Sequence, residues 1–191
     1  MSIGLILLAA GNSSRMGSPK QLLLFNGKTF LRRAAEAGIE SSCMPVVVVL
    51  GYDADRMRGE IEDLPAQIAI NSDWQAGMGT SIRVGIEHLE KLAPVEATIV
   101  TLCDQPRVDA GALCRLLAEY REKDGPIVAA SYGQTLGVPA VFPRRYFPAL
   151  RQLPPAGGAK QLLLKNASDV IAVPMDEAAV DVDTPADFQA L

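Results

Sequence analysis

Residues 7–23 read LLAAGNSSRMGSPKQLL, in which an apolar run ends at Gly11 and is followed by small polar residues, Arg15 and Lys20. The apolar residues 3–9 before this glycine predict a short buried strand of a parallel sheet. Glycine-containing loops that follow strands commonly bind phosphate through their backbone N–H groups. The sequence therefore predicts a strand that leads into an anion-binding loop.

This loop matches neither of the two commonest phosphate-binding patterns. A Walker A loop has four residues between its glycines and then Lys-Ser/Thr, whereas five residues separate Gly11 from Gly17 and two more precede Lys20. The dinucleotide fingerprint G-x-G-x-x-G fails as well, because the residue two after Gly11 is Ser13. We therefore expect neither a P-loop nor a nicotinamide-dinucleotide fold.

Strands and helices alternate along the rest of the chain. The clearest strands lie in MPVVVVLGY, residues 44–52, and in ATIVTLCD, residues 97–104, and both are apolar on two faces. We expect further strands at 66–70, 127–131 and 170–173, and helices at 29–38, 54–62, 81–92, 110–122, 159–166 and from 185. This pattern predicts an α/β fold with a mostly parallel central sheet flanked by helices, in three layers. Ligands bind beyond the carboxyl ends of such strands, where Gly11, Gly51, Asp104 and the loop after Ser131 should gather.

Glycine and proline predict irregular structure in two places. One is the stretch up to Pro143, and the other is PRRYFPALRQLPPAGGAK, residues 143–160, which we expect to be a surface loop or lid.

Length and composition exclude several classes of protein. With 191 residues, 49% of them hydrophobic and 21% charged, the chain fits a single domain over residues 1–191. A net charge of −4 argues against a nucleic-acid partner. Three scattered cysteines favour neither a disulfide framework nor a zinc site. The first residues, MSIGLILLAAG, lack a basic region and are too short to span a membrane, so we expect a cytoplasmic protein.

The stretch LAAGNSSRMGSPKQLLLFNGKTFL, residues 8–31, resembles the signature L-A-[AG]-G-x-x-x-R-M-G-x-x-K-x-L of nucleotidyltransferases built on a Rossmann-like sheet. These enzymes include the molybdenum cofactor guanylyl- and cytidylyltransferases. The resemblance implies catalytic roles for Arg15 and Lys20. An arginine can bind phosphate oxygens in a fork, and a lysine supplies a compact charge. It also implies nucleotide binding by Leu8, Ala9, Ala10, Gly11, Arg15 and Lys20.

A second segment, NSDWQAGMGTSIRVGI at residues 71–86, resembles N-x-x-W-x-x-G-M-x-x-S-I of the molybdenum-cofactor branch. There the glycine–serine turn touches the base and ribose, so the resemblance implies that Gly77 and Ser81 bind the nucleotide. Two other readings stay open. Ser81 is a good helix N-cap, and Trp74 could pack as a core residue.

Two further segments carry the expected metal ligands. TLCDQP, residues 101–106, places Asp104 at the end of a buried strand, where a carboxylate can hold a hard cation or begin a turn. In the resembled family this aspartate binds Mg²⁺ and is also one of the catalytic residues. The resemblance places the second metal ligand in the motif that reads VDVDTPADF at residues 180–188. We favour Asp183 and keep Asp181 in reserve, because alternate residues of an extended segment point in opposite directions. Asp183 could instead cap the following helix.

The resemblance also implies a substrate. LAAG, LCDQP and GVPAVFP at residues 137–143 resemble the cytidylyltransferase side of the family. The implied reaction is the transfer of CMP from CTP to molybdenum-loaded molybdopterin, with release of pyrophosphate. A molybdenum hydroxylase or its maturation factor is the implied protein partner.

One segment departs from the family pattern. A Gly-Asp-x-Gly-Ala-Arg-like segment is replaced by PPAGGAK, with no aspartate and with Lys160 in place of the arginine. The helix start at 158–160 could still receive an anionic acceptor. Guanylyl transfer, a different phosphorylated acceptor and a non-catalytic molybdopterin-binding accessory protein therefore remain as alternatives.

Overall fold

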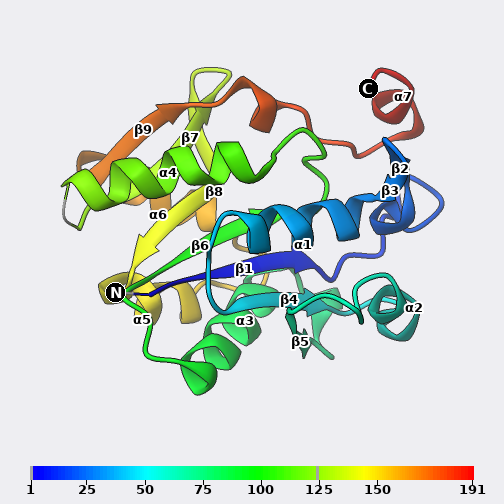
Figure 1. The fold of residues 1–191 in the computed structure, drawn as a ribbon, viewed down its shortest axis with the longest axis horizontal. Helices are drawn as coiled ribbons and strands as arrows, with labels where there is room; N and C mark the ends of the chain where they lie inside the picture. The colour runs from blue at the N-terminus through cyan, green and yellow to red at the C-terminus, as the bar shows by residue number, and fades with distance from the viewer. Residues whose placement is uncertain (1, 124) are drawn as a thin grey trace.

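The computed structural model describes residues 2–123 and 125–191, and within them the fold is built on a seven-stranded sheet (Figure 1). The strand order is β5-β4-β1-β6-β8-β7-β9. The strands are β1 Ile3–Ala9, β4 Val46–Leu50, β5 Gln67–Ile70, β6 Ala97–Leu102, β7 Ile127–Tyr132, β8 Thr135–Pro143 and β9 Val170–Pro174. All neighbouring pairs are parallel except those of β8, which runs antiparallel to both β6 and β7. The expected mostly parallel α/β sheet is confirmed.

Helices cover both faces of this sheet. Those packed on one face are α1 Phe30–Glu40, α2 Ala54–Gly59 and α4 Ala110–Lys123, and those on the other are α3 Met78–Leu92, α5 Phe147–Arg151 and α6 Ala159–Lys165. The remaining elements are the β2 Leu24–Phe25 and β3 Lys28–Thr29 hairpin, α7 Pro185–Gln189 and the 3₁₀ turns Lys20–Leu22, Trp74–Ala76, Arg144–Tyr146, Ala167–Asp169 and Asp176–Ala179. No helix of the described residues has both the length and the apolar character needed to cross a membrane.

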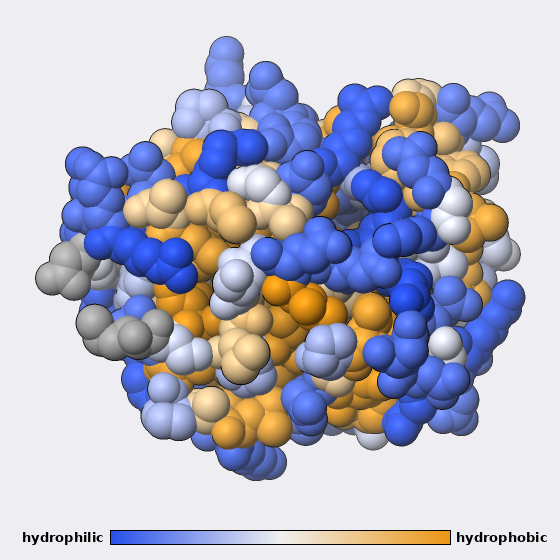
Figure 2. All heavy atoms as spheres, in the orientation of Figure 1, coloured by the Kyte–Doolittle hydropathy of each residue, from blue (hydrophilic) through white to orange (hydrophobic). Residues whose placement is uncertain are grey.

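Strand β1 shows how the sequence builds the two cores. Its alternate residues face opposite sides, so Leu5 and Leu7 join one apolar cluster while Ile6 and Leu8 join the other. All seven residues of β1 are buried, and each large aliphatic side chain contributes about 1.5–3 kcal/mol by burial. In the orientation of Figure 1, hydrophilic residues are spread across the surface and interrupt the apolar ones (Figure 2). The central strands are therefore a rigid base for the loops at their carboxyl ends.

The two stretches expected to be irregular contain regular structure, so the expectation was wrong for residues 135–143 and for the first half of 143–160, whereas residues 152–158 are irregular. Residues 135–143 form strand β8 in spite of Gly137 and Pro139. Its pairing with β7 passes from Ala140 directly to Gly137, so Pro139 lies in a bulge where its missing N–H costs no ladder hydrogen bond. The stretch 143–160 is not a lid over its first half, because Phe147 and Leu150 of α5 are fully buried against the sheet.

Candidate active site

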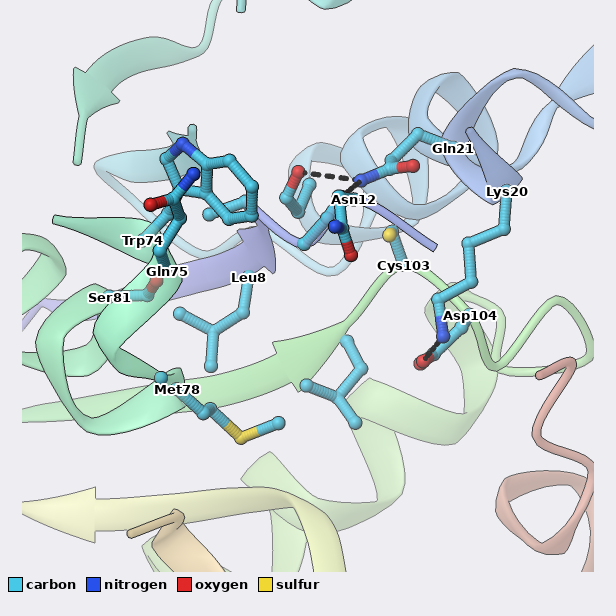
Figure 3. Close-up of a pocket in the computed structure, with 15 residues that line it drawn as sticks. Leu8, Asn12, Lys20, Gln21, Trp74, Gln75, Met78, Ser81, Cys103 and Asp104 are labelled. Carbon is cyan, nitrogen blue, oxygen red and sulfur yellow. Dashed lines mark hydrogen bonds and ion pairs between the residues drawn. The ribbon is translucent and has the colours of Figure 1, made fainter. Parts of the chain in front are cut away.

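The glycine loop is held in shape by one buried side chain, Gln21. Its Nε2 donates hydrogen bonds to the carbonyl oxygens of Ala9 and Gly11 at 3.0 and 2.6 Å (Figure 3). The hydroxyl of Ser13 donates to Oε1 of Gln21 and accepts from the backbone N–H of Lys20 at 2.9 Å. A Cβ atom added at Gly11 would meet nothing within 4 Å, so the loop backbone there faces open space. A ligand can therefore approach it closely.

A cavity of about 520 Å³ opens beside this loop at the carboxyl edge of the sheet. Such a volume lies in the usual range of small-molecule sites. Its lining comes from the loop, the turn before α3 and the end of β6: Leu8, Ala9, Ala10, Gly11, Asn12, Lys20, Gln21, Trp74, Gln75, Gly77, Met78, Ser81, Leu102, Cys103 and Asp104. Figure 3 shows Lys20 and Asp104 on one side and Trp74, Gln75, Met78 and Ser81 on the other. The structure thus brings together every residue expected to bind the nucleotide except Arg15, which lies outside this lining.

The charged end of the cavity is an ion-pair network centred on Lys20. The Lys20 ammonium pairs with Oδ2 of Asp104 and, at 2.9 Å, with Oδ1 of Asp183. Arg15 pairs with the other oxygen of Asp183 at 2.9 Å. The second carboxylate is held beside the first because the N–H of Val182 donates to the carbonyl oxygen of Asp104 at 3.0 Å.

Three pKa shifts follow from this geometry. Burial lowers the pKa of Lys20, but the charge and hydrogen bonds of Asp104 and Asp183 outweigh it, so the net shift is upward. The hydrogen bond from Lys20 lowers the pKa of Asp183. Burial and the nearby charge of Asp104 raise the pKa of Asp181. Asp183, not Asp181, is therefore the carboxylate that the structure pairs with the cations.

The donor set at this end fits a hard cation. Oδ1 of Asp104 is buried and has no hydrogen-bond partner among the described residues, and a buried carboxylate oxygen rarely stays unpaired. No cluster of three or more His, Cys, Asp or Glu side chains that could hold a metal is found in the described part of the chain. Mg²⁺ is commonly held by one or two carboxylates, with phosphate oxygens and water as its other ligands. Asp104 and Asp183 meet that requirement.

The opposite end of the cavity is organised by Asn71, which follows β5 and is 2% exposed. Its Nδ2 donates to the hydroxyl oxygens of Thr80 and Ser81, both at 2.9 Å. Trp74 contacts the ring of Tyr52 edge to face, with centroids 5.6 Å apart, and is only partly buried. This side of the cavity therefore combines the apolar side chains of Trp74 and Met78 with polar groups, among them the hydroxyl that Asn71 holds in place, that of Ser81.

Two capping alternatives are wrong. Helix α3 begins at Met78 with Gly77 as its N-cap, so Ser81 lies inside the first turn and is not the cap. The cap of α7 is Thr184, which forms a capping box with Asp187. The carboxylate of Asp183 is thus free for the ion pairs described above.

The segment PPAGGAK, which differs from the family pattern, packs against the cavity wall. The carbonyl oxygen of Pro155 accepts from the N–H of Gly79 at 2.9 Å, and Cβ atoms at Gly77 or Gly79 would come within 2.5 and 2.1 Å of proline carbonyl oxygens. Lys160 is exposed on α6, a helix of only seven residues. This segment therefore supports the turn before α3.

Sequence reasoning missed Gln21 and Asn71. Both stood inside the quoted motifs, Gln21 directly after the lysine and Asn71 as the first residue of the N-x-x-W pattern.

A glycine-containing loop after the first strand, with a carboxylate after the adjacent parallel strand, is an arrangement typical of nucleotide-binding α/β proteins. Residues 5–170 match the model of the MobA-like NTP transferase domain, so the chain belongs to that family. The resemblance inferred from the sequence is thereby confirmed. Asp181 and Asp183 lie beyond the matched range.

Two curated proteins are similar to parts of this chain. Nicotine blue oxidoreductase of Paenarthrobacter nicotinovorans is 36% identical over 140 residues, which are 73% of this chain and 66% of that protein. The bifunctional protein GlmU of Bifidobacterium animalis subsp. lactis is 34% identical over 128 residues, which are 64% of this chain but 28% of that protein. The chain thus spans about two thirds of the first relative and about a quarter of the second.

The crystal structure of Rv0371c from Mycobacterium tuberculosis H37Rv aligns with a TM-score of 0.84 at 26% identity, covering 100% of this chain and 97% of that one. A structure of the same mycobacterial protein in complex with manganese aligns with a TM-score of 0.82 at 25% identity over 100% and 98% of the two chains.

Proposed function

We propose that this protein is a Mg²⁺-dependent cytidylyltransferase that transfers CMP from CTP to molybdenum-loaded molybdopterin. The observation that carries the proposal is the convergence of Lys20, Asp104 and Asp183 at one end of a nucleotide-sized cavity whose other end is lined by apolar and polar side chains. In the reaction, a terminal phosphate oxygen of the acceptor attacks the α-phosphorus of CTP. The bond from that phosphorus to the bridging oxygen breaks, and pyrophosphate leaves with the electron pair.

Charge stabilisation and positioning supply most of the rate in such transfers. Asp104 and Asp183 would hold Mg²⁺, which neutralises phosphate oxygens and helps pyrophosphate to leave. Lys20 follows the α-phosphate as its charge develops. Arg15, whose side chain is 70% exposed, turns from Asp183 to the outer phosphates.

The choice of CTP rests on Ala10, whose methyl group lines the cavity. In the proposed complex the base lies against this methyl group, where a purine is more crowded than a pyrimidine. One methyl group changes discrimination by only about 10–200-fold. Guanylyl transfer and a different phosphorylated acceptor are therefore the nearest competing proposals. A molybdenum hydroxylase or its maturation factor is the proposed recipient of the product.

A second candidate comes from the name of the relative that is 36% identical, an oxidoreductase. An oxidoreductase needs an electron donor, and the loop after the first strand lacks the G-x-G-x-x-G pattern of a dinucleotide site, which makes this candidate weaker than nucleotidyl transfer. A non-catalytic carrier of molybdopterin is the third candidate.

One experiment separates these candidates. Pyrophosphate release is measured with Mg²⁺ and molybdenum-loaded molybdopterin, with CTP, GTP, ATP or UTP, and a parallel reaction follows NADH or NADPH oxidation with a dye. The Asp104→Asn variant and a reaction without acceptor are the controls. We expect release with CTP, at least tenfold above the other nucleotides and lost in the variant. Full release by Asp104→Asn, or dye reduction alone, would overturn the proposal.

A further inference from the structure

The side-chain amide of Asn71 has an orientation that the backbone fixes. Its Oδ1 accepts the backbone N–H of Asp73 at 3.0 Å. An N–H can only donate, so the oxygen of the amide must face it and the nitrogen must face the other way. The two amide hydrogens therefore point at the hydroxyl oxygens of Thr80 and Ser81.

These two hydroxyl groups use their protons differently. Thr80 donates its proton within the turn, to the carbonyl oxygen of Gly77 at 2.7 Å. The carbonyl oxygen of Asp73 is a second acceptor for the same hydroxyl, at 3.2 Å. Ser81 accepts from Asn71 in the same way, but no acceptor for its own proton is found among the described residues. Ser81 also lines the cavity. Its single proton is thus available only to what the cavity holds.

We propose that Asn71 is a positioning residue that sets Ser81 as a hydrogen-bond donor toward the nucleotide base. The inference rests on the proposed function in so far as a nucleotide occupies this cavity. A fixed donor suits a base edge that presents acceptor atoms, such as O2 and N3 of cytosine. It is mismatched to an edge that presents only an N–H group.

The variant Asn71→Asp inverts this arrangement with almost no change of shape. One carboxylate oxygen keeps the N–H of Asp73, while the other has no proton to donate and accepts the proton of Ser81. The cavity is then offered a lone pair where it had a donor. Leaving a buried polar pair mismatched weakens binding by roughly ten- to a hundredfold.

The test compares two ligands whose difference is the nucleoside. Dissociation constants for CTP and for inorganic tripolyphosphate, both with Mg²⁺, are measured by calorimetry on the wild type, Asn71→Asp, Ser81→Ala and the double variant. Asn166→Asp is the matched control, because it makes the same chemical change at an amide that donates to Leu162 on α6, a residue outside the cavity lining.

We expect Asn71→Asp to weaken the binding of CTP about ten- to a hundredfold and to leave the affinity for tripolyphosphate unchanged. In the Ser81→Ala background the same substitution should have no further effect, because Asn71 acts through that hydroxyl. Asn166→Asp should bind both ligands as the wild type does. Where Asn71→Asp does not fold, Asn71→Ala, which adds no buried charge, replaces it with a smaller, few-fold loss expected for CTP alone.

Two results overturn the inference while the proposed function stands. One is an equal loss for CTP and tripolyphosphate, and the other is a loss of CTP affinity that persists in the Ser81→Ala background; either shows a general structural role. A wild-type protein that binds tripolyphosphate but no nucleotide, or neither ligand, overturns the proposed function itself.

Discussion

Replacing Lys20 with methionine tests the charged end of the site most directly. Methionine keeps the length and apolar stem of lysine but removes the ammonium that pairs with Asp104 and Asp183. The side chains of Lys20 and Asp104 are only 15% and 17% exposed, so the variant leaves a carboxylate without its counter-ion in a poorly solvated place. Removing one partner of a buried ion pair costs about 3–5 kcal/mol.

The loss in this variant should be smaller than that range. The side chain of Asp183 is 35% exposed and keeps its ion pair with Arg15, so water and that guanidinium compensate part of its charge. We therefore expect a destabilisation of about 2–3 kcal/mol, which for a protein of this size lowers Tm by roughly 4–12 °C. Without the ammonium, Oδ2 of Asp104 and Oδ1 of Asp183 are also free for a divalent cation.

Thermal unfolding in the absence of nucleotide, with and without about 10 mM Mg²⁺, measures both the destabilisation and the binding of the cation. The wild type should respond weakly to Mg²⁺, because Lys20 occupies both carboxylates, whereas Lys20→Met should recover much of its loss. Lys28→Met, which breaks an ion pair to Glu36 at a lysine that is 50% exposed, is the control and should change stability by less than about 0.5 kcal/mol. An unchanged Tm in Lys20→Met, or equal Mg²⁺ stabilisation of both proteins, would refute the reasoning.

Three further substitutions test the surroundings of the site. Gln21→Leu leaves two loop carbonyl groups without their shared donor, so we expect CTP affinity to fall about tenfold by calorimetry, and unchanged affinity would contradict the role of this side chain. Gly79→Ala places a Cβ atom 2.1 Å from the carbonyl oxygen of Pro154, and urea unfolding should show a loss of about 1–3 kcal/mol that Gly59→Ala, with nothing within 4 Å, does not show. The neighbouring ammonium holds the pKa of Asp183 below 3.8, so its stabilisation is present above about pH 4 and disappears as the pH falls through the lowered pKa. Asp183→Asn should therefore flatten the acid side of a plot of Tm against pH, and a curve as steep as that of the wild type would contradict this.

Long apolar runs made the sheet predictable. Residues 3–9, 46–50 and 97–101 are apolar for the most part and buried on both faces, and such runs are typical of central parallel strands. The topology then determines where their carboxyl ends meet, which is why Gly11, Gly51 and Asp104 could be expected to share one edge. Strand β8 was not predicted because the bulge that accommodates Pro139 depends on the pairing of β8 with β7. The propensities of single residues carry no information about the partner strand.

The hydrogen bonds of the site were less accessible to sequence reasoning. Gln21 reaches carbonyl groups ten and twelve residues away, and Asn71 reaches hydroxyl groups nine and ten residues away. Such contacts depend on how a loop returns toward its own strand. A motif indicates that a residue type belongs at a position, but only the folded structure shows which donor faces which acceptor.

The second carboxylate depends on a part of the chain far from the loop that it serves. Val182, between Asp181 and Asp183, is fully buried in a small apolar cluster with Met16 and Phe30, and the ring of Phe188 packs edge to face on that of Phe30 at 6.1 Å. This cluster binds the end of the chain to the segment that follows the glycine loop. The N–H of Val182 adds a direct hydrogen bond to Asp104. The apolar cluster, more than the ion pairs themselves, therefore determines where Asp183 lies, because burial is not screened by solvent and does not depend on which cation the site holds.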